Sequence, residues 1–287
     1  MKDENRTNDG PLSDRRIALI GGGQMGLALA EGFCRAGLVT ADAITVYDPA
    51  TAARDRLSAR LPGIRLVDSA AAAAAAARTV ILAVKPQQAA AACRDIASSL
   101  TADAVLVSIV AGLSTQALAR LSGATRIVRV MPNTPCLVGR GVSVVCHAPA
   151  VPAADRDRVL ALLGAVGTAH EVDESLMDAV TGLSGSGPGF VAVLVEALAD
   201  GGVKAGLPRP LAQALATQTL SGTAALLDQT GEHPAQLKDR VASPGGTTIA
   251  GLAVLEQRGV RGALIDAVVA AAARGRELGR TTATDEG

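Results

Sequence analysis

Residues 16–26 read RIALIGGGQMG, a pattern that predicts a strand, a tight turn and a helix. Arg16–Ile20 is a short apolar run that stops at glycine, which indicates a buried strand. In the spacing Gly21-x-Gly23-x-x-Gly26, the first glycine permits the turn and the second lets a pyrophosphate approach. The third allows the helix to pack closely on the strand. Because the helix would offer free N–H groups, the turn suits the phosphates of a dinucleotide. The alternative is a plain glycine-rich turn.

The rest of the first half alternates between strand-like and helix-like segments. Continuous β-branched runs are typical of parallel strands buried on both faces. The further strands predicted are Ala43–Tyr47, Ile64–Val67, Thr79–Val84, Ala104–Val110, Arg126–Met131 and Val142–His147. Helical patterns cover Gln24–Ala36, Gln87–Leu100 and Ala153–Leu163. This alternation predicts an α/β Rossmann domain with a doubly wound, mostly parallel sheet over residues 15–172.

Beyond about Val172 the pattern becomes helical, and no further strand is predicted. The expected helices are Ser175–Gly182, Pro188–Lys204, Pro208–Asp228, Pro234–Val241, Thr247–Gln257 and Gly262–Leu278. Several begin at proline, whose missing N–H costs nothing in the first turn. We therefore expect an all-α domain over residues 173–280, with residues 1–14 as a disordered tail and 281–287 as a second tail. Much of the apolar surface of these helices needs a partner, which predicts a homodimer.

Composition excludes several classes of function. The chain has 27 basic and 27 acidic residues, one Tyr, two Phe and no Trp, so neither a basic face nor a stacking surface for nucleic acid is expected. No uncharged apolar stretch reaches the ~18 residues of a membrane span, and the polar start lacks a signal peptide's apolar region. The four cysteines and three histidines form no metal or disulfide pattern, which favours a reducing cytoplasm.

The end of the second predicted strand carries an acid. Asp48 lies about 22 residues after Gly26, close to the spacing of a ribose-binding carboxylate. A carboxylate there accepts the ribose 2′-hydroxyl and repels a 2′-phosphate, which slightly favours NADH. Arg54 or Arg56 would offset that repulsion, so NADPH stays open.

Three later strand ends share the carboxyl edge of the predicted sheet, where ligands bind in open α/β folds. Each is also explained as an ordinary strand-to-loop stop. Together with the glycine turn, they give these candidate cofactor-binding residues: Gly21, Gly23, Gln24, Met25, Gly26, Asp48, Ala83, Val84, Lys85, Pro86, Ala111, Gly112 and Asn133.

A second glycine turn, SPGGTT at residues 243–248, lies between two predicted helices. Its glycines expose backbone N–H groups, and Thr247 and Thr248 begin the next helix. Such a turn binds anions well and suits a small carboxylate. The alternative is a capped helix–helix turn.

Several motifs together resemble the pyrroline-5-carboxylate reductase family over residues 16–278. The matching segments are Gly21–Gly26, Ala83–Pro86, Met131–Pro135, Asp178–Pro188, Ala199–Arg209, His233–Asp239 and Ser243–Thr248. The resemblance implies a Rossmann domain followed by a helical dimerisation domain, in dimers that often form rings of five. It also implies an active site where the cofactor edge of one subunit meets the helical domain of the dimer.

The resemblance further implies a reaction and roles for individual residues. Hydride would pass from NADPH or NADH to the imine carbon of 1-pyrroline-5-carboxylate, giving L-proline in the last step of proline biosynthesis. The substrate carboxylate would bind Ser243, Gly245, Gly246 and Thr247. The Thr248 hydroxyl would reach the ring nitrogen as the catalytic group, and Glu174 matches a position near bound proline. Arg240 stands where some relatives have a shorter polar side chain near the cofactor.

Two rival functions remain. A β-hydroxyacid dehydrogenase would use Lys204 as its acid–base group, although a cation near a helix C-terminus explains that lysine more simply. A non-catalytic NAD(P)H-binding sensor would dimerise through the helices without turning over the imine.

Overall fold

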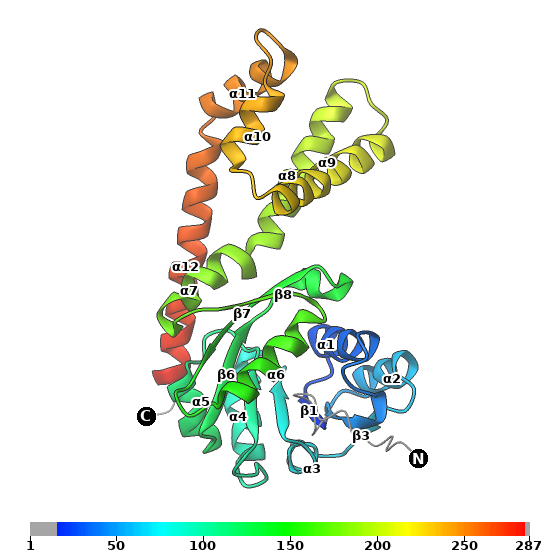
Figure 1. Cartoon of the computed structure of the whole chain (residues 1–287), viewed down its shortest axis with the longest axis vertical. Coiled ribbons are helices and arrows are strands. Elements are labelled where there is room, and N and C mark those ends of the chain that lie inside the picture. Colours follow the sequence, from blue (N-terminus) through cyan, green and yellow to red (C-terminus); the bar gives the residue numbers. More distant parts are fainter. Residues whose placement is uncertain (1–15, 285–287) are drawn as a thin grey trace, which may run out of the picture. The chain divides into compact units, whose positions relative to one another are not determined.

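The computed structural model describes residues 16–284, with side chains described up to Gly279 (Figure 1). The chain forms two compact units. The first contains the chain up to Gly185 and the segment from Ala271 onward, and the second is Ser186–Ala270. The predicted tail of residues 1–14 lies outside the described residues.

The first unit is built on one eight-stranded sheet in the order β3-β2-β1-β4-β5-β6-β7-β8. Neighbouring strands are parallel except β6 and β7, which pair antiparallel. This confirms the predicted Rossmann architecture with a mostly parallel sheet. The strands are β1 (Ile17–Ile20), β2 (Ile44–Tyr47), β3 (Arg65–Leu66), β4 (Thr79–Leu82), β5 (Val105–Ser108), β6 (Arg126–Met131), β7 (Gly141–His147) and β8 (Gly167–Glu171).

Helices cover both faces of this sheet (Figure 1). One buried cluster joins β-strand side chains to α1 (Gln24–Arg35), α2 (Thr51–Arg60) and α6 (Ala153–Gly164). The opposite cluster contains residues of α3 (Ala70–Ala75), α4 (Pro86–Ala97) and α5 (Thr115–Ser122). Two short 3₁₀ turns, η1 (Ala41–Ala43) and η2 (Thr134–Val138), complete the connections.

Strand β8 and helices α2 and α5 are among the elements of this unit that were not predicted. Strand β8 has the sequence GTAHE and is mostly solvent-exposed, so it lacks the apolar run that identifies a buried strand. It forms by parallel pairing with β7, a tertiary effect that no local pattern records. Helices α2 and α5 are short, and only one narrow face of each is buried.

The sheet unit extends past the expected boundary at residue 172. The chain continues as η3 (Glu174–Leu176), α7 (Met177–Val180) and a π-helical turn, η4 (Thr181–Gly185). Met177 is 1% exposed and packs with Val144 and Cys146 of β7, which holds this segment on the sheet.

The last helix, α12 (Val260–Thr284), also returns to the sheet unit. A Cβ on Gly279 would lie 3.0 Å from the carbonyl oxygen of Gly112, in the loop after β5. The sequence predicted an end of this helix at Leu278 and a tail from residue 281. Instead, the helix continues to Thr284.

The second unit contains α8 (Gly187–Lys204), α9 (Arg209–Thr230), α10 (Pro234–Val241), α11 (Thr247–Gln257) and the first part of α12. Helices α8 and α9 pack through Ala199, Ala212 and Ala216. The bounds of α10 and α11 agree with the predicted ones.

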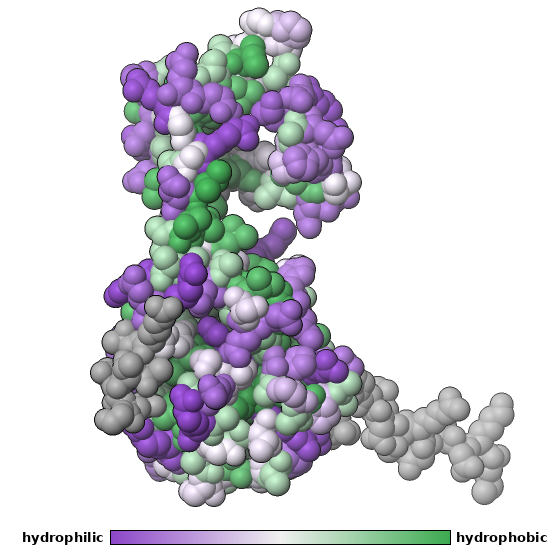
Figure 2. Space-filling view, turned by 90° about the vertical axis from the view of Figure 1, so that its left-hand side faces the viewer, coloured by the Kyte–Doolittle hydropathy of each residue, from purple (hydrophilic) through white to green (hydrophobic). Residues whose placement is uncertain are grey.

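Large apolar side chains are exposed on this helical unit, and green hydrophobic residues reach the surface among purple ones (Figure 2). They include Val191, Val193, Leu198, Leu211, Leu215, Val254, Leu255 and Ile265. One helical run, Glu174–Lys204, is long and apolar enough to cross a membrane by length and composition alone. A single run of this kind is weak evidence for a membrane span, because a core helix of a soluble protein passes the same test.

Candidate active site

The glycine turn after β1 is held by two neighbouring strands. The N–H of Gly21 donates to the carbonyl of Tyr47 at the end of β2, at 2.8 Å. Gly21 has a φ of 104°, and a Cβ there would lie 2.5 Å from the carbonyl oxygen of Ala83. Only glycine fits both the conformation and the close approach. Helix α1 then begins at Gln24 with no side-chain cap at Gly23, which leaves first-turn N–H groups available to a pyrophosphate.

Asp48 lies directly beside this turn. Its Oδ2 accepts the N–H of Gly22 at 2.7 Å, and its Oδ1 accepts the N–H of Ala50 at 2.8 Å. The carboxylate is therefore fixed where the ribose of a dinucleotide is expected. Arg54, which the sequence offered as a balancing cation, forms an ion pair with Asp68 at 3.3 Å.

The remaining predicted cofactor residues gather at the same edge of the sheet, because strands β1, β2, β4, β5 and β6 are all parallel. Ala83 and Val84 follow β4, exposed Lys85 caps α4, and Pro86 is its first residue. Ala111 and Gly112 follow β5, and Asn133 follows β6.

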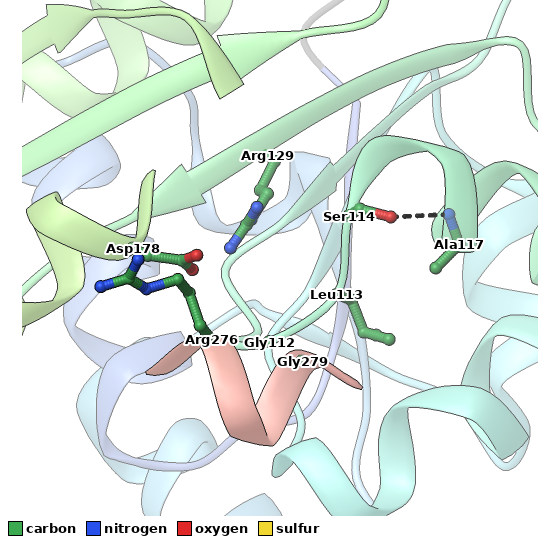
Figure 3. A pocket seen from close by; sticks show the side chains of 8 residues that line it. All are labelled: Gly112, Leu113, Ser114, Ala117, Arg129, Asp178, Arg276 and Gly279. Atoms are coloured by element: carbon green, nitrogen blue, oxygen red, sulfur yellow. Dashed lines mark hydrogen bonds between the residues drawn. The ribbon is translucent and has the colours of Figure 1, made fainter. Parts of the chain in front are cut away.

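A pocket of about 300 Å³ opens at the carboxyl end of β5 (Figure 3). Gly112, one of the predicted cofactor residues, lines it together with Ser114, Arg129, Asp178 and Arg276. Neither arginine was predicted from the sequence to line the site. The available signal was a charged residue, Arg129, within an apolar strand, since such a residue is rarely buried without a partner.

Glu174 provides that partner. One oxygen of its carboxylate accepts the N–H of Thr115 at 2.7 Å, and the other accepts the Thr115 hydroxyl at 2.6 Å. Arg129 Nη1 lies 3.3 Å from Glu174 Oε1. Both carboxylate oxygens of Glu174 therefore accept hydrogen bonds at the N-terminus of α5. Its binding of substrate stays a prediction from the resemblance.

The second glycine turn has the geometry of an anion-binding loop. Gly246 N–H donates to the Ser243 carbonyl at 3.0 Å, and Gly245 has a φ of 68°. With Pro244 in second place, this is a type II turn. A side chain on Gly246 would collide with the Ser243 hydroxyl. Helix α11 starts directly after the turn, so its first N–H groups have no intrahelical acceptors.

The two threonines that open α11 differ in exposure. Thr247 is exposed and Thr248 is half-buried. Because a first-turn hydroxyl lies next to the free N–H groups, the turn can hold a carboxylate while a threonine contacts a neighbouring atom of the same ligand. The structure therefore brings Ser243, Gly245, Gly246, Thr247 and Thr248 together in one loop.

Two other cations of the helical unit have simpler explanations. Arg240 Nη2 lies 2.8 Å from Glu232 Oε2, so its side chain forms an ion pair with a residue just before α10. Lys204 is exposed in the last turn of α8, where a cation interacts favourably with the helix dipole.

Comparison with known proteins decides the family. The model "Pyrroline-5-carboxylate reductase dimerisation" matches residues 174–278. A second model, "NADP oxidoreductase coenzyme F420-dependent", matches residues 16–112. A pyrroline-5-carboxylate reductase of Arabidopsis thaliana is 42% identical over 275 residues, covering 94% of this chain and 98% of that protein. The chain belongs to the pyrroline-5-carboxylate reductase family. Both halves of the chain, including both glycine turns, lie within that alignment.

Solved structures of the family agree with this fold. A pyrroline-5-carboxylate reductase of Coxiella burnetii is 31% identical, with a TM-score of 0.85 over 92% of this chain and 98% of that one. A pyrroline carboxylate reductase of Plasmodium falciparum, solved with NADP bound, is 34% identical, with a TM-score of 0.83 over the same shares. The resemblance stated from motifs alone is thus confirmed.

Proposed function

We propose that the chain catalyses the NAD(P)H-dependent reduction of 1-pyrroline-5-carboxylate to L-proline. The observation that carries this proposal is the 42% identity to a reductase of this name along 94% of the chain. A rival β-hydroxyacid dehydrogenase gives no reason for the Ser243–Thr248 turn, and it would require a catalytic role for Lys204.

The proposed reaction needs little acid–base catalysis from the protein. Hydride moves from the nicotinamide to the imine carbon, and a protonated imine is already electrophilic. The main task is to hold the reacting atoms about 3–3.5 Å apart in the correct orientation. The turn at Ser243 and Gly246 would fix the carboxylate, and Thr248 would orient the ring nitrogen.

Either reduced nicotinamide cofactor is compatible with the family. We propose a slight preference for NADH, because Asp48 is fixed beside the glycine turn and Arg54 is paired with Asp68. A 2′-phosphate would meet the Asp48 carboxylate, and with Arg54 paired to Asp68, Arg56 is the remaining candidate cation of α2 to offset the repulsion.

The assembly proposed is a homodimer formed through the helical unit, with rings of five dimers as the larger form. The family model of dimerisation and the exposed apolar side chains support it. We propose a cytoplasmic enzyme without nucleic-acid or membrane partners, which the four free thiols and balanced charge support.

The direct test is oxidation of NADH and of NADPH in the presence of pyrroline-5-carboxylate, followed by the absorbance of the reduced nicotinamide. A control combines a β-hydroxyacid with the oxidised cofactor. Imine-dependent oxidation is expected. Activity with the hydroxyacid alone would indicate a β-hydroxyacid dehydrogenase that uses Lys204 as its acid–base group. Cofactor binding without either activity would favour the non-catalytic sensor.

Thr248 is the residue whose removal should most affect the chemical step. We expect Thr248→Ala to lower kcat/KM by roughly ten- to a thousandfold, as the loss of one oriented hydrogen bond can. Ser243→Ala is the comparison, and it should chiefly raise the KM for the imine. Steady-state kinetics with both substrates varied separates the two effects. Unchanged kinetics in Thr248→Ala would remove this residue from the mechanism.

A further inference from the structure

The helical run Glu174–Lys204 contains a local irregularity. Its segment η4, Thr181–Gly185, is π-helical, and Pro188 follows in the first turn of α8. A proline ring clashes with the carbonyl four residues before it and supplies no N–H. For Pro188 that carbonyl belongs to Ser184, so a wider turn at this place relieves the clash.

The same proline leaves the Ser184 carbonyl without its helical donors. The α-helical donor would be the N–H of residue 188, which proline lacks. The π-helical donor would be Gly189, but its N–H donates to the Ser186 carbonyl at 3.0 Å. A half-buried carbonyl without a donor costs about 1–3 kcal/mol, so another donor is needed.

Asn133 supplies that donor from a distant part of the chain. Its Nδ2 donates to the Ser184 carbonyl at 3.2 Å, and its Oδ1 accepts the N–H of Val142 at 2.9 Å. One amide thus joins three segments: the loop after β6, the start of β7, and η4. Gly185 extends the contact, because a Cβ there would lie 2.5 Å from Met131 Cε at the end of β6.

These contacts lie at the carboxyl edge of the sheet, where ligands of this fold bind. We propose that Asn133 is a positioning residue for hydride transfer. Its amide holds the Ser184 carbonyl. It thereby keeps the segment Thr181–Gly185, next to the end of β6, in the conformation that the reaction needs. The inference rests on the reductase activity proposed above, and it replaces the direct cofactor contact expected of Asn133 from the sequence.

The proposal predicts a specific pattern for Asn133→Asp. This isosteric change keeps the acceptor for Val142 but removes the donor to Ser184, and it places a carboxylate against a carbonyl. We expect kcat to fall by about tenfold or more, because small misplacements at a reacting edge cost up to ~100-fold. The dissociation constant of the reduced cofactor, from titration calorimetry, should change by less than about twofold.

A second substitution tests whether the effect acts through Ser184. Pro188→Ala restores a backbone N–H four residues after Ser184, which makes the Asn133 donor redundant. Pro188→Ala alone should retain most of the wild-type kcat. Asn133→Asp combined with Pro188→Ala should recover most of the lost kcat, which a general loss of stability would not predict. Asn133→Ala with and without Pro188→Ala repeats the test if the aspartate variant does not fold.

Three results would overturn the proposal. A loss of cofactor affinity in proportion to activity would make Asn133 a cofactor ligand. An unchanged kcat in folded Asn133→Asp would show that the carbonyl needs no donor. A reduced kcat that Pro188→Ala does not recover would show that Ser184 does not transmit the effect. Because unmodified protein and Pro188→Ala must first reduce the imine, a failure of the proposed function itself would appear in those two controls.

Discussion

Asp48 combines two tasks in one carboxylate, since it closes the glycine turn and faces the expected ribose. We expect Asp48→Ser to shift the ratio of kcat/KM values toward NADPH by about tenfold or more, because the repulsion of a 2′-phosphate is removed. Kinetics with both cofactors measure this ratio. Arg56→Ala serves as the comparison, and a shift toward NADH there would show that Arg56 contributes to phosphate binding. No shift in Asp48→Ser would leave the Asp48 argument without support.

The pKa of the Cys146 thiol is changed by the groups around it. Burial and the nearby Glu174 carboxylate raise the pKa of its thiol from 9.0 to about 11. Between these values the unfolded chain has lost the proton that the folded protein keeps, so stability falls as the pH rises from 9 to 11. We expect this loss to be roughly 1–3 kcal/mol, and to be smaller in Cys146→Ala. Urea unfolding at several pH values measures it, and equal slopes in both proteins would contradict the assignment.

The sequence predicted the positions of turns well where the signal is local. Both glycine turns were located correctly because their spacing and flanking elements are local features. It did not identify the partners of Glu174 and Asn133, because those contacts join residues such as Thr115 and Ser184 that are far apart in the chain. Their geometry exists only after the sheet has formed.

Helix α6 is fixed to the sheet by a buried acid. Asp155 is 1% exposed, and its oxygens lie 3.0 Å from Arg78 and 3.2 Å from Arg126. Removing the acid leaves the half-buried guanidinium groups of Arg78 and Arg126 without it, so Asp155→Ala should lower the free energy of unfolding by about 3–5 kcal/mol. Asp103→Ala is the matched control, because Asp103 is exposed and lies 3.9 Å from Arg78. It should lower the free energy of unfolding much less, because an exposed ion pair is screened by solvent. Equal effects in urea unfolding would show that burial does not decide the strength of these pairs.

Elements with a strong local pattern were predicted almost to the residue, as α10 and α11 show. Strand β8 was not predicted, because its stability comes from pairing with β7 rather than from its own apolar content. The sequence predicted that a helix ends at Gly182, but a π-helical turn covers Thr181–Gly185, for the reason that Pro188 gives. From the sequence, Pro188 predicted only the start of α8, and not the change that it causes in the turn before it.

At the scale of the whole molecule, the helical unit exposes apolar side chains that a monomer would leave in water. Val193 is 63% exposed on α8. We expect the unmodified protein to scatter light as a dimer or larger, and Val193→Glu to shift it toward the monomer mass of 28.7 kDa. A buried charge without a partner opposes association. Ala59→Glu, at an exposed position of α2, should leave the assembly unchanged. A monomeric wild type at micromolar concentration would reject the homodimer.

The hydrogen bond between Gly21 and the carbonyl of Tyr47 has a spectroscopic consequence. Tyr47 is the only tyrosine, and the chain has no tryptophan. The intrinsic fluorescence of the native protein therefore arises almost entirely from one ring, which packs against the buried cluster that contains Ile20 and α3. Its intensity and anisotropy report on the packing at the end of β2, without a label or a substitution. The chain therefore contains a built-in optical probe of the strand end whose carbonyl holds Gly21.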